Sequence, residues 1–533
     1  MKTNSTPSRQ NGDPSNQVND SSSAEKQPSA STSISGMRVQ WSDQSKQVTQ
    51  MAGLAYFVQF LETTGLFDHF IESCPLAYQS NNAPHKRAVL GTILLSVLSG
   101  HTRYAHMSAL SGNGLDAQLL KMQSIPSEDS IRSALRKLVD SPECAEQAHS
   151  WLSGCFEQFH EGVFQVPWIL DVDATVKPLY GKQQGAVVGY NPTKPGRPSH
   201  VYHSFWVAHL RLCLDVQVLP GNQSAGAFSL GNLLEWLKQR ASEQLPQFVR
   251  GDISYGTQRW MKELEALEID YLFKLKQTKG VKELIAASEE WTAHFSGWQC
   301  CESALQLSGW DCSRRVVVCR RAHRRKVKAA TRTSELCGPI KESEQLPLEL
   351  LDEQQMPSYE YAVYVTSLSE PAQEIRALYN PRGDNENCYD ELKNQWGWCG
   401  FTVRDLARSE LMARLIALIY NWWSLYTKLV DEQIAREAIT SRPMFLLHVA
   451  KMSTHQSMRT LIIFCAHVQA KQIQAKLEAA ALRLKEWALL TAEQLKARSL
   501  WKRIFEHILS NHRTFKGKNY RAPPMLKAPT WEN

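Results

Sequence analysis

Three acidic residues far apart in the chain are candidates for metal-dependent chemistry. Asp173 lies within an apolar segment with the pattern of a buried strand, Asp252 ends a short strand-like segment, and Glu386 lies in a segment with helical spacing. A divalent cation such as Mg²⁺ prefers carboxylate oxygens, water and substrate phosphates as ligands. Two such ions about 3.5–4 Å apart can activate an attacking oxygen and stabilise a leaving one. The three acids are therefore a candidate site for two Mg²⁺ or Mn²⁺ ions, although a solvated or salt-bridged role is the default for any single one.

The segment around Glu386 adds cations and a phenol to the same helix face. Tyr379, Arg382, Glu386 and Lys393 follow one another at intervals of three, four and seven residues. At about 100° per residue, the last three fall within a sector of roughly 40°. Glu391 points away from Glu386 by roughly 140° and is expected at the surface. The pattern predicts an acid for metal flanked by groups that hold phosphates, and the alternative is a surface helix with ordinary charge pairing.

These residues carry a resemblance to a known family. The Y-(2)-R-(3)-E-(6)-K spacing resembles the signature of bacterial insertion-sequence transposases, which have a DDE triad on an RNase H-like fold. The segments LDVDATVKPLYGKQQGAVVGYNPTKPGRPSH and YNPRGDNENCYDELKNQWGW resemble the transposase DDE group 1 type. The likeness runs from about residue 50 to about residue 525. It implies that the catalytic and metal-binding residues are Asp173, Asp252 and Glu386. It also implies that the residues holding DNA phosphates near the cut are Tyr379, Arg382 and Lys393.

The resemblance further implies an activity and its partners. A DNA transposase of this kind cleaves insertion-sequence ends by two-metal phosphodiester hydrolysis and joins the 3′-hydroxyl ends to target DNA, which is cut-and-paste transposition. Its partners would be double-stranded DNA, as terminal inverted repeats and target, and a second copy of the chain in a homodimeric synaptic complex. Two alternatives stay open: a metal-dependent DNA nuclease without strand joining, and a catalytically inactive DNA-binding derivative.

Asp171 is an alternative first metal ligand. It lies two residues before Asp173 and therefore on the same side of the expected strand. We favour Asp173 because the following Ala174-Thr175 matches the family pattern of aspartate, small residue and Ser or Thr. The residues Arg250-Gly251-Asp252 resemble the second aspartate motif, in which the acid ends a short strand before a helix.

The rest of the chain predicts the elements that must position these residues. Residues 1–36 hold ten serines and few large apolar residues, which predicts a disordered tail. Residues 50–160 have helical spacing and form either a DNA-end-binding domain or a helical packing domain. Residues 163–277 and 356–403 alternate strands and helices, so they are expected to be the two parts of an α/β catalytic domain. Residues 404–533 predict a C-terminal helical region with a basic tail.

Residues 278–355 interrupt the alternation and are predicted to be a β-rich, basic insertion. Asp252 and Glu386 are 134 residues apart, far more than one strand and one helix require. From Arg314 to Arg332 there are nine Lys or Arg and no acid. Contact with DNA phosphates is therefore expected, at Arg320, Arg321, Arg324 and Arg325. The competing interpretation is a solvated basic strand edge that resists aggregation.

Two other features of the insertion have structural interpretations. Trp298 could stack on an unpaired base, but a core position is favoured because the chain has 16 tryptophans. A group of thiols and an imidazole superficially suggests zinc: Cys300, Cys301, Cys312, Cys319 and His323. Their spacing fits no common finger or ribbon, so strand-packing thiols are favoured.

Composition sets the outer limits on fold and location. The 533 residues suggest three or four domain-sized units, and 43% hydrophobic with 21% charged residues excludes a wholly disordered or fibrous chain. A net charge of +7 permits a polyanionic partner. No run approaches 18 apolar residues, which excludes a membrane-spanning protein. The twelve cysteines contain no C-x-x-C pair and no signal peptide precedes them. A cytoplasmic protein with reduced thiols, acting at the bacterial nucleoid, is expected.

Overall fold

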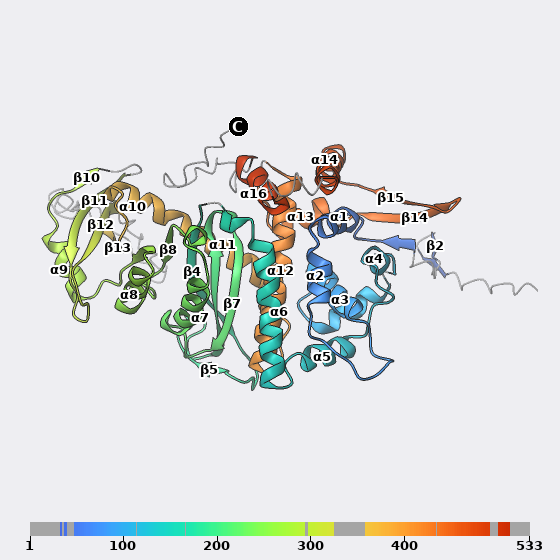
Figure 1. Ribbon diagram of the computed structural model, residues 1–533, viewed down its shortest axis with the longest axis horizontal. Coiled ribbons are helices and arrows are strands. Elements are labelled where there is room, and N and C mark those ends of the chain that lie inside the picture. Colours follow the sequence, from blue (N-terminus) through green and yellow to red (C-terminus); the bar gives the residue numbers. More distant parts are fainter. Residues whose placement is uncertain are drawn as a thin grey trace, which may run out of the picture. The chain divides into compact units, whose positions relative to one another are not determined.

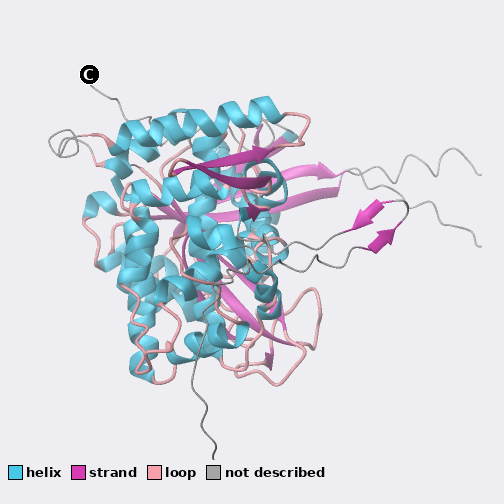
Figure 2. Ribbon diagram, turned by 90° about the vertical axis from the view of Figure 1, so that its right-hand side faces the viewer, coloured by secondary structure: helices cyan, strands magenta, loops and turns pink. Residues whose placement is uncertain are grey.

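The computed structural model describes residues 32–34, 37–39, 47–112, 114–165, 167–293, 297–323, 358–432, 434–490 and 499–511. The chain forms two compact units, 1–45 and 46–533. The first contains an antiparallel hairpin of β1 (Thr32–Ile34) and β2 (Met37–Val39). Its first strand falls within the predicted tail, and residues 1–31 lie outside the described part. The second unit is a mixture of helices and strands (Figure 2), so the expected α/β class is confirmed.

The N-terminal part of the second unit is helical. Its elements are α1 (Leu54–Thr64), α2 (Leu66–Glu72), α3 (Lys86–Leu98), the 3₁₀ helix η2 (Tyr104–Gly112), α4 (Gly114–Leu119), α5 (Glu128–Lys137) and α6 (Pro142–His160). Local signals explain where two of them begin. The hydroxyl of Ser127 accepts a hydrogen bond from the Ser130 amide and Glu128 and Asp129 fill the first turn of α5. Ser141 caps α6 in the same way, ahead of Pro142.

A ten-stranded sheet of described strands forms the centre of the second unit. The order is β10-β11-β12-β13-β9-β8-β4-β6-β5, and β7 also pairs with β6. Among the strands that the structure describes, only the β4–β8 and β8–β9 pairs are parallel. The strand bounds are β4 (Ile169–Pro178), β5 (Val187–Val188), β6 (Pro198–Val207), β7 (Leu212–Pro220), β8 (Phe248–Gly251), β9 (Asp270–Lys274), β10 (Thr292–Ala293), β11 (Trp298–Leu305), β12 (Arg314–His323) and β13 (Ser358–Thr366).

Helices connect and cover these strands. Just before β4 lies η3 (Val163–Gln165), and between the strands lie η4 (Ala208–Leu210), α7 (Ala227–Lys238), η5 (Ser242–Gln244), α8 (Gln258–Ala266) and α9 (Lys279–Ala287). After β13 follow α10 (Ala372–Tyr379), η8 (Asn380–Gly383), α11 (Asp384–Asn394), α12 (Leu406–Val430), α13 (Ala438–Phe445), α14 (Ala470–Ala488) and α16 (Leu500–Asn511). In Figure 1, α11 lies next to β4, which places its residues beside those of the strand.

The long helix α12 is the main link between the sheet and the N-terminal helices. It packs against β7 on one side and against α6, α3 and α1 on others (Figure 1). Nearly all of its residues are buried, as expected for a helix that is apolar on every face. The polar Asn421 within it is fully buried because its amide donates to Cys213 O at 2.6 Å and accepts from Cys213 N at 2.8 Å. It therefore satisfies backbone groups of β7.

The C-terminal region contains a hairpin that the mostly helical expectation missed. Strands β14 (Val449–His455) and β15 (Met458–Phe464) pair with each other, and β14 also pairs with β3 (Val48–Thr49). The two turn residues, Gln456 and Ser457, have φ angles of 47° and 67°. Positive φ at both positions is what a type I′ turn requires, and it usually appears in sequence as Asn-Gly. The turn therefore carries no recognisable sequence signal.

Candidate active site

Asp171 is committed to a buried ion pair on the parallel strands. In the β4–β8 register, Asp171 lies opposite Arg250. The Arg250 guanidinium donates from Nε to Asp171 Oδ1 at 2.6 Å and from Nη2 to Oδ2 at 2.7 Å, and both side chains are buried. Its third nitrogen, Nη1, donates to the carbonyl of Leu378 near the end of α10. Asp171 and Arg250 therefore fix the helical segment that carries Tyr379 and Arg382 to the strands below it.

Asp173, two residues further along β4, has different neighbours. It is 8% exposed, its Oδ1 accepts from the Ala174 amide at 2.8 Å, and its Oδ2 accepts from Arg382 Nη1 at 2.7 Å. Burial raises the pKa of this carboxyl to about 6; Arg382 opposes the increase and the negative charge of Asp252 adds to it. The structure thus brings Asp173 close to Arg382 and to Asp252, two of the other predicted site residues.

Asp252 follows the last residue of β8. Its Oδ1 accepts a hydrogen bond from the Ser254 amide at 2.8 Å, which holds the carboxylate at the start of the loop. Gly251, just before it, has no room for a side chain, because an added Cβ would lie 2.9 Å from both Tyr255 and Val172. The tight packing under Gly251 keeps the end of β8 close to β4, where Asp252 interacts electrostatically with Asp173.

Glu386 lies on the first turns of α11 and faces solvent. Its side chain is 75% exposed, and its carboxylate is 4.0 Å from Arg382 Nη2. Arg382 therefore lies between Glu386 and Asp173. Among the residues that the structure describes, no three His, Cys, Asp or Glu side chains are placed to hold a metal ion together. The predicted triad is thus connected through Arg382 rather than gathered around a common point.

Arg382 and Tyr379 lie next to each other beside Asp173. The guanidinium of Arg382 lies 5.7 Å from the ring centroid of Tyr379. Burial lowers the pKa of Arg382, but Asp173, Tyr379 and Asp252 outweigh it and the pKa is raised. Tyr379 is 8% exposed and packs on Tyr364, and burial raises its pKa to about 12. Its buried hydroxyl interacts with the Arg382 guanidinium, which opposes the increase in its pKa.

Lys393 and Glu391 lie on different sides of α11. Lys393 is half-buried; burial lowers its pKa, whereas Cys399, Asp390 and Asp173 act in the opposite direction. Glu391 does point away from Glu386, but the prediction that it is a surface residue is wrong. It is 5% exposed, and its Oε1 accepts from Trp396 Nε1 at 3.0 Å and from Ala438 N at 2.9 Å. The opposite face of α11 is the protein interior rather than solvent.

Three residues beneath the acids were not predicted. The hydroxyls of Tyr389 and Ser204 are 2.6 Å apart, and Ser204 lies opposite Asp173 in the β4–β6 pair. Tyr255 is fully buried, and the pKa values of both tyrosines are raised well above the ordinary value, by burial first and then by Asp173. Each tyrosine follows one of the predicted acids by three residues. That spacing is a sequence signal for the two tyrosines, but it does not mark Ser204.

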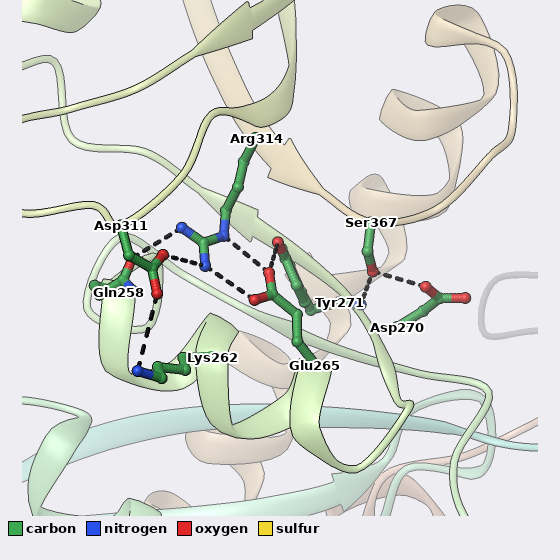
Figure 3. A network of polar contacts seen from close by, with 8 residues as sticks. All are labelled: Gln258, Lys262, Glu265, Asp270, Tyr271, Asp311, Arg314 and Ser367. Carbon is green, nitrogen blue, oxygen red and sulfur yellow. Dashed lines mark hydrogen bonds and ion pairs between the residues drawn. The ribbon is translucent and has the colours of Figure 1, made fainter.

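The basic strand β12 is more fully paired than its sequence suggests. Arg314 is 5% exposed and bonds to Glu265, Gln258 and Asp311 in the network of Figure 3. Arg315 forms an ion pair with Glu302 at 2.6 Å. The acids that the basic block lacks in sequence therefore come from neighbouring elements.

Arg320 and Arg321 on β12 also have partners. Arg320 bonds Gln299 at 2.8 Å and lies 3.9 Å over the ring of Trp291, and Arg321 pairs with Glu360 at 2.8 Å. Because β12 lies between β11 and β13, the alternative of a basic strand edge is wrong for Arg314–His323, the part of the basic block that the structure describes. Arg324 and Arg325 lie outside the described residues.

Trp298, Cys300, Cys301 and Cys319 are buried in the sheet. Cys312 is exposed, so the prediction of a strand-packing thiol is wrong for this residue. Trp298 is 4% exposed, with the guanidinium of Arg376 3.3 Å from its ring centroid and that of Arg321 4.9 Å away. The core interpretation is confirmed, because no face of the ring is open to a base. Cys300 and Cys319 are buried cross-strand neighbours with their sulfur atoms 2.8 Å apart. The side chain of His323 lies outside the described part.

Comparison with known proteins places the chain in a family. Residues 31–486 match the family model described as Transposase DDE domain group 1. The chain belongs to this family. The expectation of a DDE transposase, an enzyme class that generally uses divalent metal ions, is therefore confirmed at this level.

The remaining comparisons add little beyond the family. The chain is similar to a chain in the cryo-EM structure of the piggyBac transposase synaptic complex with hairpin DNA, with 10% sequence identity and a TM-score of 0.36 over 87% of this chain and 86% of that one. No curated protein sequence matches it. None of the helices that the structure describes is both long and apolar enough to cross a membrane.

Proposed function

We propose that this transposase performs cut-and-paste transposition of a bacterial insertion sequence. It would hydrolyse phosphodiesters at the element ends and join the freed 3′-hydroxyls to target DNA. The observation that carries the proposal is the meeting of Asp173, Asp252 and Arg382, which come from β4, from the end of β8 and from η8. Acids that are buried and repel one another, with cations beside them, are typical of a catalytic site rather than of a structural ion pair.

The strand order supports an RNase H-like catalytic domain. Strands β7, β6 and β4 are antiparallel neighbours, and β8 and β9 follow in parallel beyond β4. In this proposal residues 163–277 and 356–403 are the two parts of the domain, and 278–355 is the insertion whose strands extend the sheet. Residues 50–160 bind the element ends, and 404–533 form the C-terminal region.

The residues present fit a hard divalent cation at two of the three predicted ligands. Asp173 and Asp252 offer oxygen donors whose negative charges interact unfavourably, and a cation between them would offset that repulsion. Glu386 is an exposed carboxylate on the adjoining helix. We propose that Asp173, Asp252 and Glu386 hold two Mg²⁺ or Mn²⁺ ions. Bound ions would supply an activated water and charge neutralisation at the leaving oxygen.

The chain's own residues would bind and orient the DNA strand. Arg382 presents a planar fork of donors suited to a phosphate, and in the protein alone this fork is held by Asp173. The Tyr379 hydroxyl, which lies beside the Arg382 guanidinium, can donate to a phosphate oxygen that this guanidinium binds. Lys393 adds a positive charge seven residues beyond Glu386 on the same helix. Together these groups would hold the scissile phosphate against the two aspartates.

The assembly and location complete the proposal. Both ends of an element must be cut together, so the synaptic complex would contain a homodimer bound to two terminal inverted repeats and then to target DNA. The chain would act at the nucleoid in the bacterial cytoplasm.

A strand-transfer assay tests the proposed function. Labelled duplexes from the DNA on either side of the gene are incubated with the protein, a target plasmid and Mg²⁺. Joined label in the plasmid is the expected product, and Asp173→Asn provides the inactive control. Cutting without joining would instead identify a nuclease, and binding without cutting would identify an inactive derivative. Either outcome rejects the transposition proposal.

A further inference from the structure

A cavity of about 620 Å³ adjoins the candidate active site. On one side it is lined by residues at the start of η2 and by Arg132 of α5. On the other side it is lined by the end of α11, including Lys393, and by the segment Cys399–Thr402. Its volume is within the range of roughly 300–1,000 Å³ that is usual for small-molecule sites. The cavity thus lies between the N-terminal helices and α11, the helix that carries Glu386.

The walls of this cavity are held in place by close backbone contacts. Phe401 N donates to Thr102 O at 2.6 Å, and a Cβ added to Gly400 would lie 2.0 Å from the same oxygen. Phe401 itself has a φ of 45°, a strained value for a residue with a large side chain. Its ring packs edge-to-face on Tyr104 at 5.2 Å. The strained backbone of Phe401 indicates that the surrounding packing holds this cavity wall in its conformation.

The residues that line the cavity are suited to an anion. Arg103, Arg132 and Lys393 supply three positive charges, and the described lining includes no carboxylate. Outside the lining, Glu128 forms an ion pair with Arg132 at 3.3 Å. The guanidinium of Arg132 lies 4.5 Å over the ring of Tyr104. Tyr104 is 2% exposed, and its hydroxyl has no hydrogen-bond partner among the described residues. A buried, unpartnered hydroxyl beside cations is expected where a polar ligand completes the site.

The cavity is also connected to the strand that carries Asp173. Lys177 of β4 is 8% exposed, and its ammonium donates to the carbonyl of Gly400, a lining residue, at 2.6 Å. Lys177 follows Asp173 by four residues, which is roughly 13 Å along a strand. Each strand of duplex DNA carries one negative charge per about 3.4 Å of the helix axis. A DNA strand held at Asp173 therefore has further phosphates at the distance of the cavity.

We propose that this cavity binds a nucleotide of the DNA strand a few positions from the scissile phosphate, with Arg103 and Arg132 on its phosphate. The inference rests on the proposed function for the identity of the DNA. A free mononucleotide has the same chemistry, and the test separates the two sources. Neither arginine belongs to the Tyr379–Lys393 motif, so they would be additional DNA-binding residues contributed by the N-terminal helices.

The first test is the salt dependence of DNA binding. Binding of a fluorescent 30-base-pair duplex is measured without divalent metal over a range of salt concentrations. Arg103→Ala with Arg132→Ala should reduce the log–log slope by about 0.9, since both arginines bind the same phosphate and each bound phosphate contributes about 0.9. Arg136→Ala removes the same charge from an exposed position on α5 and should leave the slope unchanged. Arg132→Lys keeps the charge and should retain the slope, which separates contact with phosphate from damage to packing.

The second test needs no substitution. Cys399 is exposed and lines the cavity, whereas Cys312 is exposed elsewhere and serves as an internal control. Bound duplex should slow maleimide labelling of Cys399 several-fold and leave Cys312 unaffected. Protection by deoxyadenosine monophosphate but not by duplex would assign the cavity to a free nucleotide and overturn the proposal. An unchanged slope together with unprotected Cys399 would overturn it as well.

These measurements are independent of catalysis. A protein that shows the slope change and the protection but no cutting or joining would retain the cavity assignment and lose the proposed activity. A protein that transposes normally, with neither effect, would lose only the cavity assignment.

Discussion

Two charged regions of one sheet, the candidate active site and strands β11–β13, differ in how completely their charges are paired. Each arginine described on β12 has an acid, amide or aromatic partner on a neighbouring element. At the active site, by contrast, the buried Asp173 interacts unfavourably with a second acid, Asp252. Complete pairing stabilises a fold, whereas an unsatisfied buried group costs stability unless a ligand completes it. The two regions are therefore distinguished by whether their charged side chains have favourable partners, rather than by how many charges they contain.

The same contrast exists within β4 over a distance of two residues. Asp171 and Asp173 lie on one side of the strand, yet Arg250 occupies both oxygens of Asp171 and leaves it no free role. This supports Asp173 as the first metal ligand. The predictions below test the contrast in order of decreasing effect.

The largest effect is expected from the three candidate ligands. Asp173→Asn, Asp252→Asn or Glu386→Gln should each reduce cleavage of end DNA in Mg²⁺, by on the order of 10⁴-fold for a group that acts directly in the reaction. Metal-free binding of the same DNA should remain. Asp390→Asn, on the exposed side of α11, is the matched control and should cleave normally. Substantial cleavage by the Glu386 variant would remove the helix motif from the active site.

The next effect concerns the buried pair. Arg250→Ala removes the ion pair of the buried Asp171 carboxylate, and it should reduce the free energy of unfolding by about 3–5 kcal/mol. Urea denaturation of the metal-free protein measures the loss. Replacing both residues, by Asp171→Leu with Arg250→Met, should recover much of it because no buried charge remains. Equal stability of Arg250→Ala and wild type would show that the pair is not the structural link inferred here.

A pH-dependent effect should appear at Asp173 in the metal-free protein. Its folded-state pKa is raised from 3.8 to about 6, so the folded state favours the protonated form. Stability is then greatest below about pH 4 and falls as the pH rises through 6. At pH 8, Asp173→Asn should be more stable than wild type by up to about 3 kcal/mol. Thermal unfolding in chelator from pH 4 to 8 checks the trend, and Asp171→Asn should be destabilising throughout.

The smallest effect is expected from the basic insertion. Replacing Arg320, Arg321, Arg324 and Arg325 together by Ala should reduce the salt slope of DNA binding, by about 0.9 for each phosphate that the variant no longer binds. Arg320 and Arg321 already have partners in the sheet. We therefore expect the double variant of Arg320 and Arg321 to change the salt slope less than the double variant of Arg324 and Arg325. The same fluorescence titration, run on the two double variants, measures this. A larger change from Arg320 and Arg321 would mean that their partners release them to DNA.

Local sequence determined the elements and the motif. The alternation of apolar residues around Asp173 and the three- and four-residue spacing around Glu386 depend only on neighbours in the chain, so the strand and the helix were predictable. The spacing of Tyr379, Arg382, Glu386 and Lys393 was sufficient to indicate the family that comparison then showed. The phase of α11 was also right, since Glu391 does face away from Glu386.

Only the tertiary structure decided which charges have partners. Arg250 neutralises Asp171 because of the β4–β8 register, and Glu265, Glu302 and Glu360 reach β12 from elements that are distant in the chain or across the sheet. Glu391 is buried because of what packs against α11, which helical periodicity does not specify. The cavity beside Lys393 depends on the docking of Thr102 on Phe401. Such pairings follow from strand register and helix packing, and these are set by the whole core rather than by any one segment.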